Sequence, residues 1–213
     1  MSSPARRLAI LGASGHGKVL ADIALLNGWE EVWFYDDAYP ACSVVEHWPV
    51  VGTSETLLAH VDCFAGVIVA IGDNRVRNDH LASLHEHGVN LVTLIHSRAI
   101  VSPFATLAPG CVVCAGAVLN PFAFVGPGCI INTAATVDHD CRLFNCVHVS
   151  PGANISGEVT IGRFTWVGVG ASVRQRISVG ENVIIGAGAA VISDVPDDVT
   201  VVGVPARPVH SST

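Results

Sequence analysis

The sequence predicts two consecutive folds: a small α/β domain with a parallel sheet over residues 1–92, and a parallel β-helix over residues 93–196. Residues 197–213 are expected to form a C-terminal tail. Two observations support this prediction. The first part alternates apolar runs, glycine turns and helix-like segments, which is typical of a parallel sheet with helical crossovers. The second part repeats every six residues, a period that fits neither an α-helix nor a single strand.

The α/β domain begins with strand, glycine turn and helix. The apolar run 6–11 is expected to be the first strand, and residues 18–27 a helix that Gly28 ends. Residues 68–71 are expected to form a buried strand that opens into a turn at Gly72. This Rossmann-like order places glycine turns at the carboxyl edge of the sheet, where phosphorylated ligands bind.

The glycine turn GASGHGKVL, residues 12–20, nearly has the spacing of an ATP-binding loop. Val19 stands where that loop needs a hydroxyl to coordinate magnesium, so ATP hydrolysis is not expected. The glycine spacing also departs from the dinucleotide fingerprint, although Asp36 lies about where a ribose-binding acid would be. A phosphate-binding turn and a purely structural tight turn both remain open.

The six-residue repeat defines two inward-facing series. Every sixth residue is Ile, Leu or Val: Ile95, Val101, Leu107, Val113, Leu119, Val125, Ile131, Val137, Leu143, Val149, Ile155, Ile161, Val167, Val173, Val179, Ile185 and Val191. The position four further on is compact: Ala99, Ala105, Cys111, Ala117, Ala123, Cys129, Ala135, Cys141, Val147 and Ala153. Six residues form one short strand and a turn, and three such units close a triangular coil.

Composition excludes several classes of function. The chain has a net charge of −7 with scattered Lys and Arg, which argues against a nucleic-acid partner or an anionic membrane surface. Its first residues contain no apolar run of signal-peptide or membrane-spanning length, so we expect a cytoplasmic protein without membrane insertion. Seven cysteines and a single C-x-x-C pair, Cys111 and Cys114, favour buried thiols over disulfides or a zinc site, and no metal is expected.

Several motifs, taken in order, resemble one family: GASGHGKVL, FYDD, AIGDNRVR, NTAATVDHDCRLFNCVHVSPGA and VGVPARPV. The sequence is similar to the acyltransferases that modify nucleotide-linked sugars. It most resembles the bacterial UDP-4-amino-sugar N-acetyltransferases of bacillosamine synthesis, with the sialic acid O-acetyltransferases as relatives. The resemblance spans essentially the whole chain. It implies a left-handed β-helix, a homotrimer, acetyl-CoA as co-substrate and a UDP-amino-sugar as acceptor.

The resemblance also implies roles for particular residues. His139 is expected to be the general base, Asp140 the adjacent acid where the family usually has Glu, and His148 a residue near the acetyl thioester. The expected contacts to the nucleotide sugar are Asp36 and Asp37 at the base or ribose, Gly15, His16 and Gly72 at the phosphates, and Asn74 and Arg77 as helpers. Arg77 is equally well interpreted as a solvated helix residue.

Stacking of eighteen-residue coils adds an independent expectation. Gly157 falls one coil beyond His139, where its backbone N–H is a candidate oxyanion donor. Two glycine-rich columns, Asn132–Ser150–Gly168–Gly186 and Gly152–Gly170–Gly188, are expected to form a groove for the pantetheine arm of CoA beside Val169. His139 and His148 are nine residues apart, half a coil, so they are expected to meet only across a subunit boundary.

Three alternatives remain open at this point. The first is a sugar O-acetyltransferase, because the residues do not fix the acceptor atom, the sugar or the nucleotide. The second is a non-catalytic ligand-binding or scaffold module. The third is a β-helix metal hydrase, which would require a His-x-x-x-x-His pair that His139 and His148 do not form.

Overall fold

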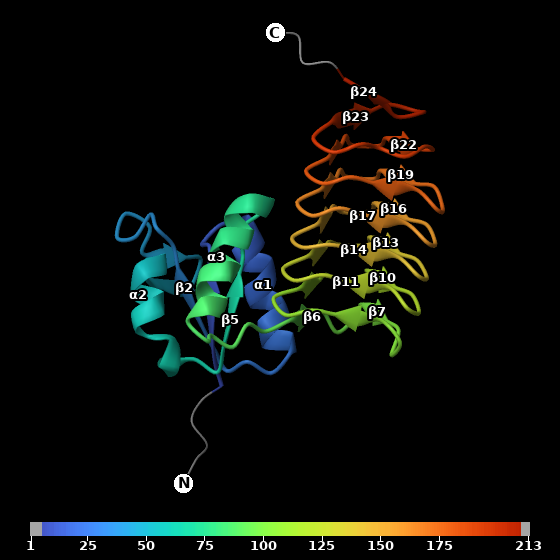
Figure 1. Ribbon diagram of the computed structural model, residues 1–213. Helices are drawn as coiled ribbons and strands as arrows, with labels where there is room; N and C mark the ends of the chain where they lie inside the picture. The colour runs from blue at the N-terminus through green and yellow to red at the C-terminus, as the bar shows by residue number, and fades with distance from the viewer. Residues whose placement is uncertain (1–5, 210–213) are drawn as a thin grey trace. The chain divides into compact units, whose positions relative to one another are not determined.

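The computed structural model describes residues 6–209, and the chain divides between Ser97 and Arg98 into two compact units. Figure 1 shows a first unit of helices around a sheet and a second unit of stacked coils. Within the described residues, no helix is both long and apolar enough to cross a membrane.

The first unit is built on a five-stranded sheet with the order β3-β4-β2-β1-β5. Its strands are β1 Arg7–Leu11, β2 Glu31–Tyr35, β3 Val44–Val45, β4 Trp48–Gly52 and β5 Gly66–Val69. Strand β1 pairs in parallel with β2 on one side and β5 on the other, which confirms the predicted parallel sheet. Strands β3 and β4 form an antiparallel hairpin that the sequence analysis did not anticipate. The switch in strand order beside β1 is the position at which open α/β sheets bind ligands.

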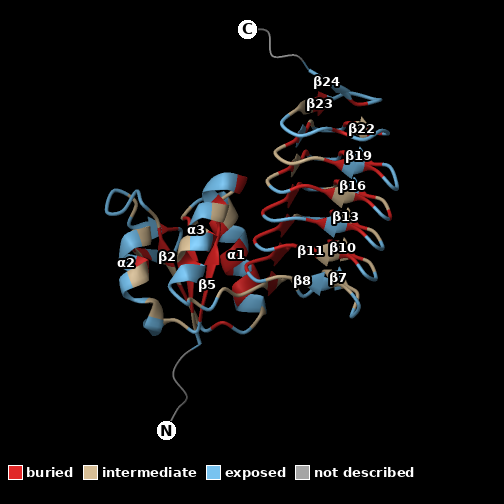
Figure 2. Ribbon diagram, viewed as in Figure 1, coloured by how far each residue is buried: buried red, intermediate tan, exposed pale blue. Residues whose placement is uncertain are grey.

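The helices of this unit are α1 Gly15–Leu26, α2 Ser54–Ala59 and α3 Asn74–Glu86, with a short 3-10 helix at Val61–Cys63. Helix α1 begins three residues earlier than expected because the chain enters it from an extended Ser14. Strand β5 ends at Val69 rather than residue 71, so the following turn is longer. Buried strands lie at the centre of the unit, while the helices expose their outer faces (Figure 2).

Two glycines of the first turn are required by close packing. Gly12 has φ +113°, and a Cβ added there would lie 2.8 Å from the carbonyl oxygen of Ala70. At Gly17 an added Cβ would collide with the Gly12 carbonyl and would lie 2.8 Å from the Phe34 ring. Structural demands therefore account for Gly12 and Gly17, whereas Gly15 and Gly72 face open space.

The second unit is the left-handed parallel β-helix, in which three sheets form the sides of a prism (Figure 1). The six-stranded sheet contains β7 Ile100–Val101, β10 Val118–Leu119, β13 Thr136–Val137, β16 Asn154–Ile155, β19 Ser172–Val173 and β22 Ala190–Val191. The five-stranded sheet contains β8 Thr106–Leu107, β11 Phe124–Val125, β14 Arg142–Leu143, β17 Thr160–Ile161 and β20 Ser178–Val179. The eight-stranded sheet contains β6 Leu94–Ile95, β9 Val112–Val113, β12 Ile130–Ile131, β15 His148–Val149, β18 Trp166–Val167, β21 Ile184–Ile185, β23 Thr200–Val202 and β24 Arg207–Pro208.

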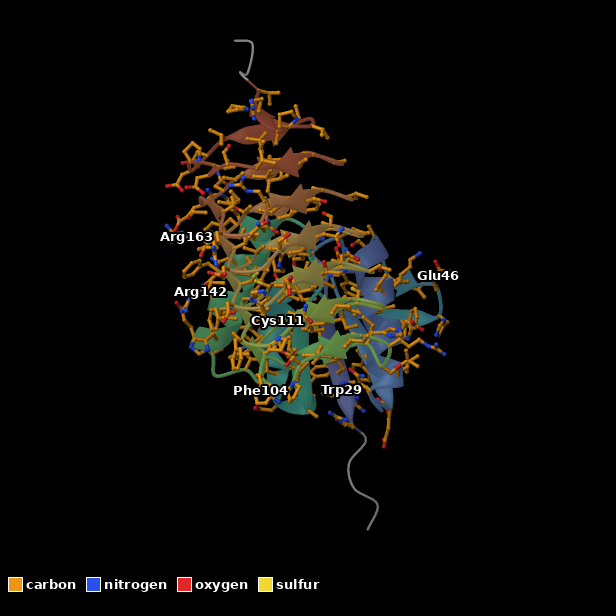
Figure 3. The ribbon with its side chains drawn as sticks, turned by 90° about the vertical axis from the view of Figure 1, so that its right-hand side faces the viewer. Trp29, Glu46, Phe104, Cys111, Arg142 and Arg163 are labelled. Carbon is orange, nitrogen blue, oxygen red and sulfur yellow. The ribbon has the colours of Figure 1, made fainter. Side chains whose placement is uncertain are left out.

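The register confirms the predicted coil. Ile130 pairs with His148, and His148 pairs with Trp166, so each residue lies beside the residue eighteen positions further on. Ion pairs at the outer corners follow the same register, with Arg163 Nε 2.7 Å from Glu181 Oε2. Arg142 and Arg163 extend outward at one edge of the stack (Figure 3). The coils are therefore stacked without a shift over the region that contains the candidate site.

The predicted inward series form the core of the prism. From Val113 to Val191 every sixth residue is at most 2 % exposed, and Cys111, Cys129 and Cys141 are fully buried. Ile95, Val101 and Leu107 are only half-buried because they belong to the first strands of the three sheets, where the stack begins. The three cysteines thus pack as small core residues, as the repeat predicted.

A left-handed backbone conformation marks every corner of the prism. Each sixth residue from Gly110 to Gly188 has φ between 54° and 75°, whether or not it is glycine. Asp140 is one of these residues, with φ 58°. Asp tolerates this conformation better than most side chains do. The corner therefore fixes the backbone directly after His139.

Candidate active site

His139 lies in the turn between β13 and β14, at the corner between the six- and five-stranded sheets. Its Nδ1 is 2.8 Å from Asp140 Oδ2, and both side chains are about half exposed, at 52 % and 53 %. The His139 backbone N–H donates to Asp138 Oδ1, which also accepts a hydrogen bond from Asn120 Nδ2. Sequence reasoning missed Asp138 and Asn120, although their spacing of one coil is a signal that could have found them.

The charges around His139 favour its protonated form. The hydrogen bond that His139 Nδ1 donates to Asp140 is the largest cause that raises the pKa of His139 above its ordinary value, and the charges of Asp138, Asp140 and Glu158 add to it. With Nδ1–H held by Asp140, the ring presents Nε2 as the atom that can accept a proton. The Asp140 side chain, although shorter than Glu, thus reaches Nδ1 of His139.

Gly157 packs directly against the imidazole of His139. A Cβ added at Gly157 would lie 2.6 Å from Nε2 and 2.7 Å from Cε1 of His139. The Gly157 carbonyl accepts the N–H of Arg176, whereas its own N–H donates to no group of the described chain. Stacking thus brings Gly157, which has no side chain, directly beside the basic nitrogen of His139, as the coil register predicted; the role of its N–H as an oxyanion donor stays a prediction.

His148 lies on a different side of the prism, on β15 of the eight-stranded sheet. It is 6 % exposed, and its ring centroid is 4.1 Å from that of Trp166. Asn132 Nδ2 lies 3.2 Å from His148 Nε2. His148 and Asn132, both predicted at the acetyl-CoA site, therefore contact each other, while His139 lies at another corner.

The two predicted glycine columns differ in what their missing side chains allow. A Cβ at Gly168 would lie 2.5 Å from the Ile185 carbonyl oxygen, and one at Gly186 would lie 2.8 Å from a methyl group of Val202. These two glycines are needed for close stacking of coils, so they do not by themselves leave an open strip, contrary to our expectation. In the second column, Gly152, Gly170 and Gly188 each face open space.

Gly152, Gly170 and Gly188 lie in the turns at one corner of the prism, and the open space at this corner runs along them. Val169 lies between the columns and is 56 % exposed. This corner separates the eight-stranded from the six-stranded sheet, and the His139 corner separates the six-stranded from the five-stranded sheet. Both corners thus border the six-stranded sheet, whose later strands present small uncharged residues outward: Thr136, Asn154, Ser172 and Ala190.

In the α/β unit, the two predicted acids are engaged with backbone N–H groups. Asp36 Oδ2 accepts the Ala13 N–H at 2.7 Å, which ties the carboxyl end of β2 to the first glycine turn. Asp37 Oδ1 accepts the Ser54 N–H at 2.8 Å, and hydrogen bonds from Ser54 lower the pKa of Asp37. Both carboxylates therefore hold neighbouring backbone segments at the edge of the sheet. Their direct contact with a base or ribose remains a prediction.

His16 occupies the first turn of α1 and is held neutral. Burial, with a smaller contribution from the charge of Arg77, lowers the pKa of His16 to about 4. Its Nε2 atom is buried and has no hydrogen-bond partner in the described chain. A buried ring nitrogen without a hydrogen-bond partner lowers the stability of the folded state, and this observation favours a ligand contact at His16.

Arg77 is not a solvated helix residue, so that interpretation was wrong. Its side chain is 1 % exposed, and Nη1 donates to the carbonyl oxygens of Ile71 and Gly72 at 2.8 and 2.9 Å. Nη2 donates to Asn74 Oδ1 at 2.6 Å, and Asn74 is 7 % exposed. The two predicted helpers therefore lie behind the β5–α3 turn.

No group of three or more His, Cys, Asp or Glu side chains able to hold a metal ion occurs among residues 6–209. A β-helix with a His139–Asp140 pair at one corner, preceded by an α/β unit, matches the architecture expected of the acetyltransferases.

Comparisons with known proteins specify the family. Residues 7–84 match the PglD N-terminal domain family. The acetyltransferase domain of PglB from Neisseria gonorrhoeae, solved with acetyl coenzyme A, is 44 % identical, with coverage of 96 % of this chain and 99 % of that one and a TM-score of 0.91. A mutant perosamine N-acetyltransferase from Caulobacter crescentus, solved with CoA and GDP-perosamine, is 36 % identical, with coverage of 96 % and 97 % and a TM-score of 0.92. WeeI from Acinetobacter baumannii is 26 % identical, with coverage of 95 % and 99 % and a TM-score of 0.86.

The chain belongs to the sugar N-acetyltransferases of the hexapeptide-repeat, left-handed β-helix superfamily.

Proposed function

We propose that the protein transfers the acetyl group of acetyl-CoA to the 4-amino group of a UDP-linked amino sugar, as in synthesis of UDP-N-acetylbacillosamine. The observation that supports this most is the His139 corner, where Asp140 engages Nδ1 and the bare backbone of Gly157 faces Nε2. The α/β domain, residues 1–92, would hold the nucleotide sugar, and the reaction would take place in the cytoplasm. The 44 % identity to a domain solved with acetyl coenzyme A supports the choice of co-substrate.

In the proposed mechanism, the neutral amine attacks the thioester carbonyl and His139 Nε2 takes the proton that nitrogen loses. A C–N bond forms, and the Gly157 N–H stabilises the oxyanion of the tetrahedral intermediate. The C–S bond then breaks, and the imidazolium returns the proton to the CoA thiolate. Transfer is direct, because the nearest thiol in sequence, Cys141, is fully buried with a pKa raised by burial to about 11.

The pH dependence tests the role of Asp140. Because the base must be neutral, kcat/KM should rise with pH through the pKa of His139, which lies above 6.5. In Asp140→Asn the main cause of the raised pKa is removed, so the acidic limb should move to lower pH while the plateau falls. Initial rates from pH 5.5 to 9 measure both effects, and an unchanged limb would show that Asp140 does not act on His139.

We further propose a homotrimer in which the six-stranded sheet faces the threefold axis. Cyclic symmetry then sets the His139 corner of each copy against the Gly152–Gly170–Gly188 corner of its neighbour, because these two corners border the same sheet. CoA would lie between them, along Gly152, Gly170 and Val169, with His148 and Asn132 near the thioester. Each active site would thus need two chains.

Mixed trimers test this arrangement. His139→Ala removes the base, and Val169→Trp fills the open corner at an exposed position; each variant alone should be inactive. If the variants are mixed at random within trimers, about a quarter of the sites combine an intact His139 with an intact neighbouring corner, so about a quarter of the activity should return. If trimers that are verified to be mixed regain no activity, then His139 and Val169 belong to the same site within one chain, and the proposed arrangement is wrong.

The acceptor is tested by thiol release from acetyl-CoA with a panel of UDP-4-amino-sugars, GDP-4-amino-sugars and free sialic acid. The proposal expects the highest kcat/KM for a UDP-4-amino-sugar. Preference for the GDP sugars would match the relative solved with GDP-perosamine. Activity on sialic acid alone would move the protein to the O-acetyltransferases, and no turnover or acetyl-CoA binding would favour a non-catalytic module.

A further inference from the structure

We infer that Arg77 is a positioning residue for the acceptor: its guanidinium holds the β5–α3 turn against the Gly12–His16 turn, so that both turns form one rigid rim for the nucleotide sugar. This inference rests on the proposed function, since it concerns the substrate that the α/β unit would bind.

The first observation is the geometry of the guanidinium. Arg77 reaches back from the first turn of α3 to the carbonyls of Ile71 and Gly72, and to Asn74 Oδ1 at the start of the helix. These three bonds use the planar fork of arginine, whose donors have fixed directions. Because the side chain is 1 % exposed, it acts from behind the turn rather than by touching a ligand.

The second observation is that the outer surface of the same turn is bare. A Cβ at Gly72 would have no atom within 4 Å, and the same holds for Gly15 at the start of α1. The Asp73 carboxylate does not project there, because its Oδ1 accepts the N–H groups of Arg75 and Val76 at 2.9 Å each. The backbone that Arg77 holds is therefore the surface offered to a ligand at this edge of the sheet.

The third observation is that the two turns touch. A Cβ at Gly12 would lie 2.8 Å from the Ala70 carbonyl oxygen and 3.2 Å from Cγ1 of Ile71. A shift of Ile71 would therefore be transmitted to the Gly12–His16 turn, where Nε2 of His16 is buried without a partner. The charge of Arg77 also acts on His16 directly, as the smaller of two causes that lower the pKa of this histidine.

Two substitutions separate the fork from the charge. Arg77→Lys keeps the charge but loses the planar fork, and Arg77→Met loses both at similar length. We expect both variants to raise the KM for the nucleotide sugar about tenfold or more, with the larger rise in Arg77→Met. The KM for acetyl-CoA should not change, and kcat should stay within about threefold of the wild-type value. Should Arg77→Met not fold, Arg77→Lys still tests the inference.

A matched control distinguishes positioning from general loss of stability. Leu81 lies on the same helix and is 7 % exposed, so Leu81→Ala should lower the Tm without raising the acceptor KM. An acceptor KM that rises equally in Leu81→Ala and Arg77→Lys would overturn the inference, as would an unchanged acceptor KM in both Arg77 variants.

Calorimetry with UDP and GDP as probes makes the result independent of turnover. The wild-type protein should bind at least one of them, and Arg77→Lys should bind it about tenfold more weakly, while Leu81→Ala binds it as the wild type does. Failure of the wild type to bind either nucleotide would overturn the inference. Nucleotide binding that depends on Arg77, without acetylation of any acceptor, would support the inference and contradict the proposed function.

Discussion

His139→Ala should lower kcat by on the order of 10²-fold or more while leaving the dissociation constant for acetyl-CoA nearly unchanged. The reason is that Nε2 of His139 is the proposed proton acceptor and faces Gly157, whereas the open corner proposed for CoA lies on the other border of the six-stranded sheet. Steady-state kinetics and calorimetry measure the two quantities separately. Because His139 is about half exposed, its loss should not unfold the β-helix.

A histidine outside the proposed site provides the control. His85 is exposed in the last turn of α3, so His85→Ala should keep wild-type kinetics. Full activity of His139→Ala would end the general-base account, and an equal loss in His85→Ala would point to a nonspecific effect of the substitutions.

Gly157→Ala should reduce turnover to a similar extent, by on the order of 10²-fold. The added Cβ would lie 2.6 Å from His139 Nε2, closer than real Cβ contacts, so the imidazole must move away from the reacting amine. The measurements are kcat for the variant and the pKa of His139 followed by NMR titration.

Gln175 occupies the equivalent corner position one coil further along and is exposed, so Gln175→Ala is the matched control and should retain activity within about twofold. An active Gly157→Ala enzyme would show that the contact between Gly157 and His139 has no part in the reaction.

The coil architecture could be predicted because its signal is repeated along the chain. Each unit from Val113 to Val191 places an Ile, Leu or Val in the core, so errors at single positions do not alter the period. The same register predicted the contact between Gly157 and His139 and could have found the Asn120–Asp138 bond. Left-handed corners filled by residues such as Asp140 carry no comparable residue pattern.

The α/β unit was less predictable because its details depend on tertiary contacts. In the hairpin, β3 has only two residues, and β4 contains Pro49, which argues against a strand in a sequence pattern. Arg77 gave no sign in the sequence that it is buried, since only the fold brings the carbonyls of Ile71 and Gly72 within reach of its guanidinium. The glycine columns show the same limit, because stacking distances decide that Gly168 relieves a close contact while Gly170 faces open space.

The most direct test of the central claim is the identity of the acetylated product. The protein is incubated with acetyl-CoA labelled with ¹³C in the acetyl group and a UDP-4-amino-sugar, and the product is analysed by mass spectrometry and NMR, with hydroxylamine treatment to distinguish amide from ester. Our account predicts a singly acetylated nucleotide sugar whose label is in an amide at the 4-nitrogen and withstands hydroxylamine. A hydroxylamine-labile ester, or release of thiol without any acetylated sugar, would contradict it.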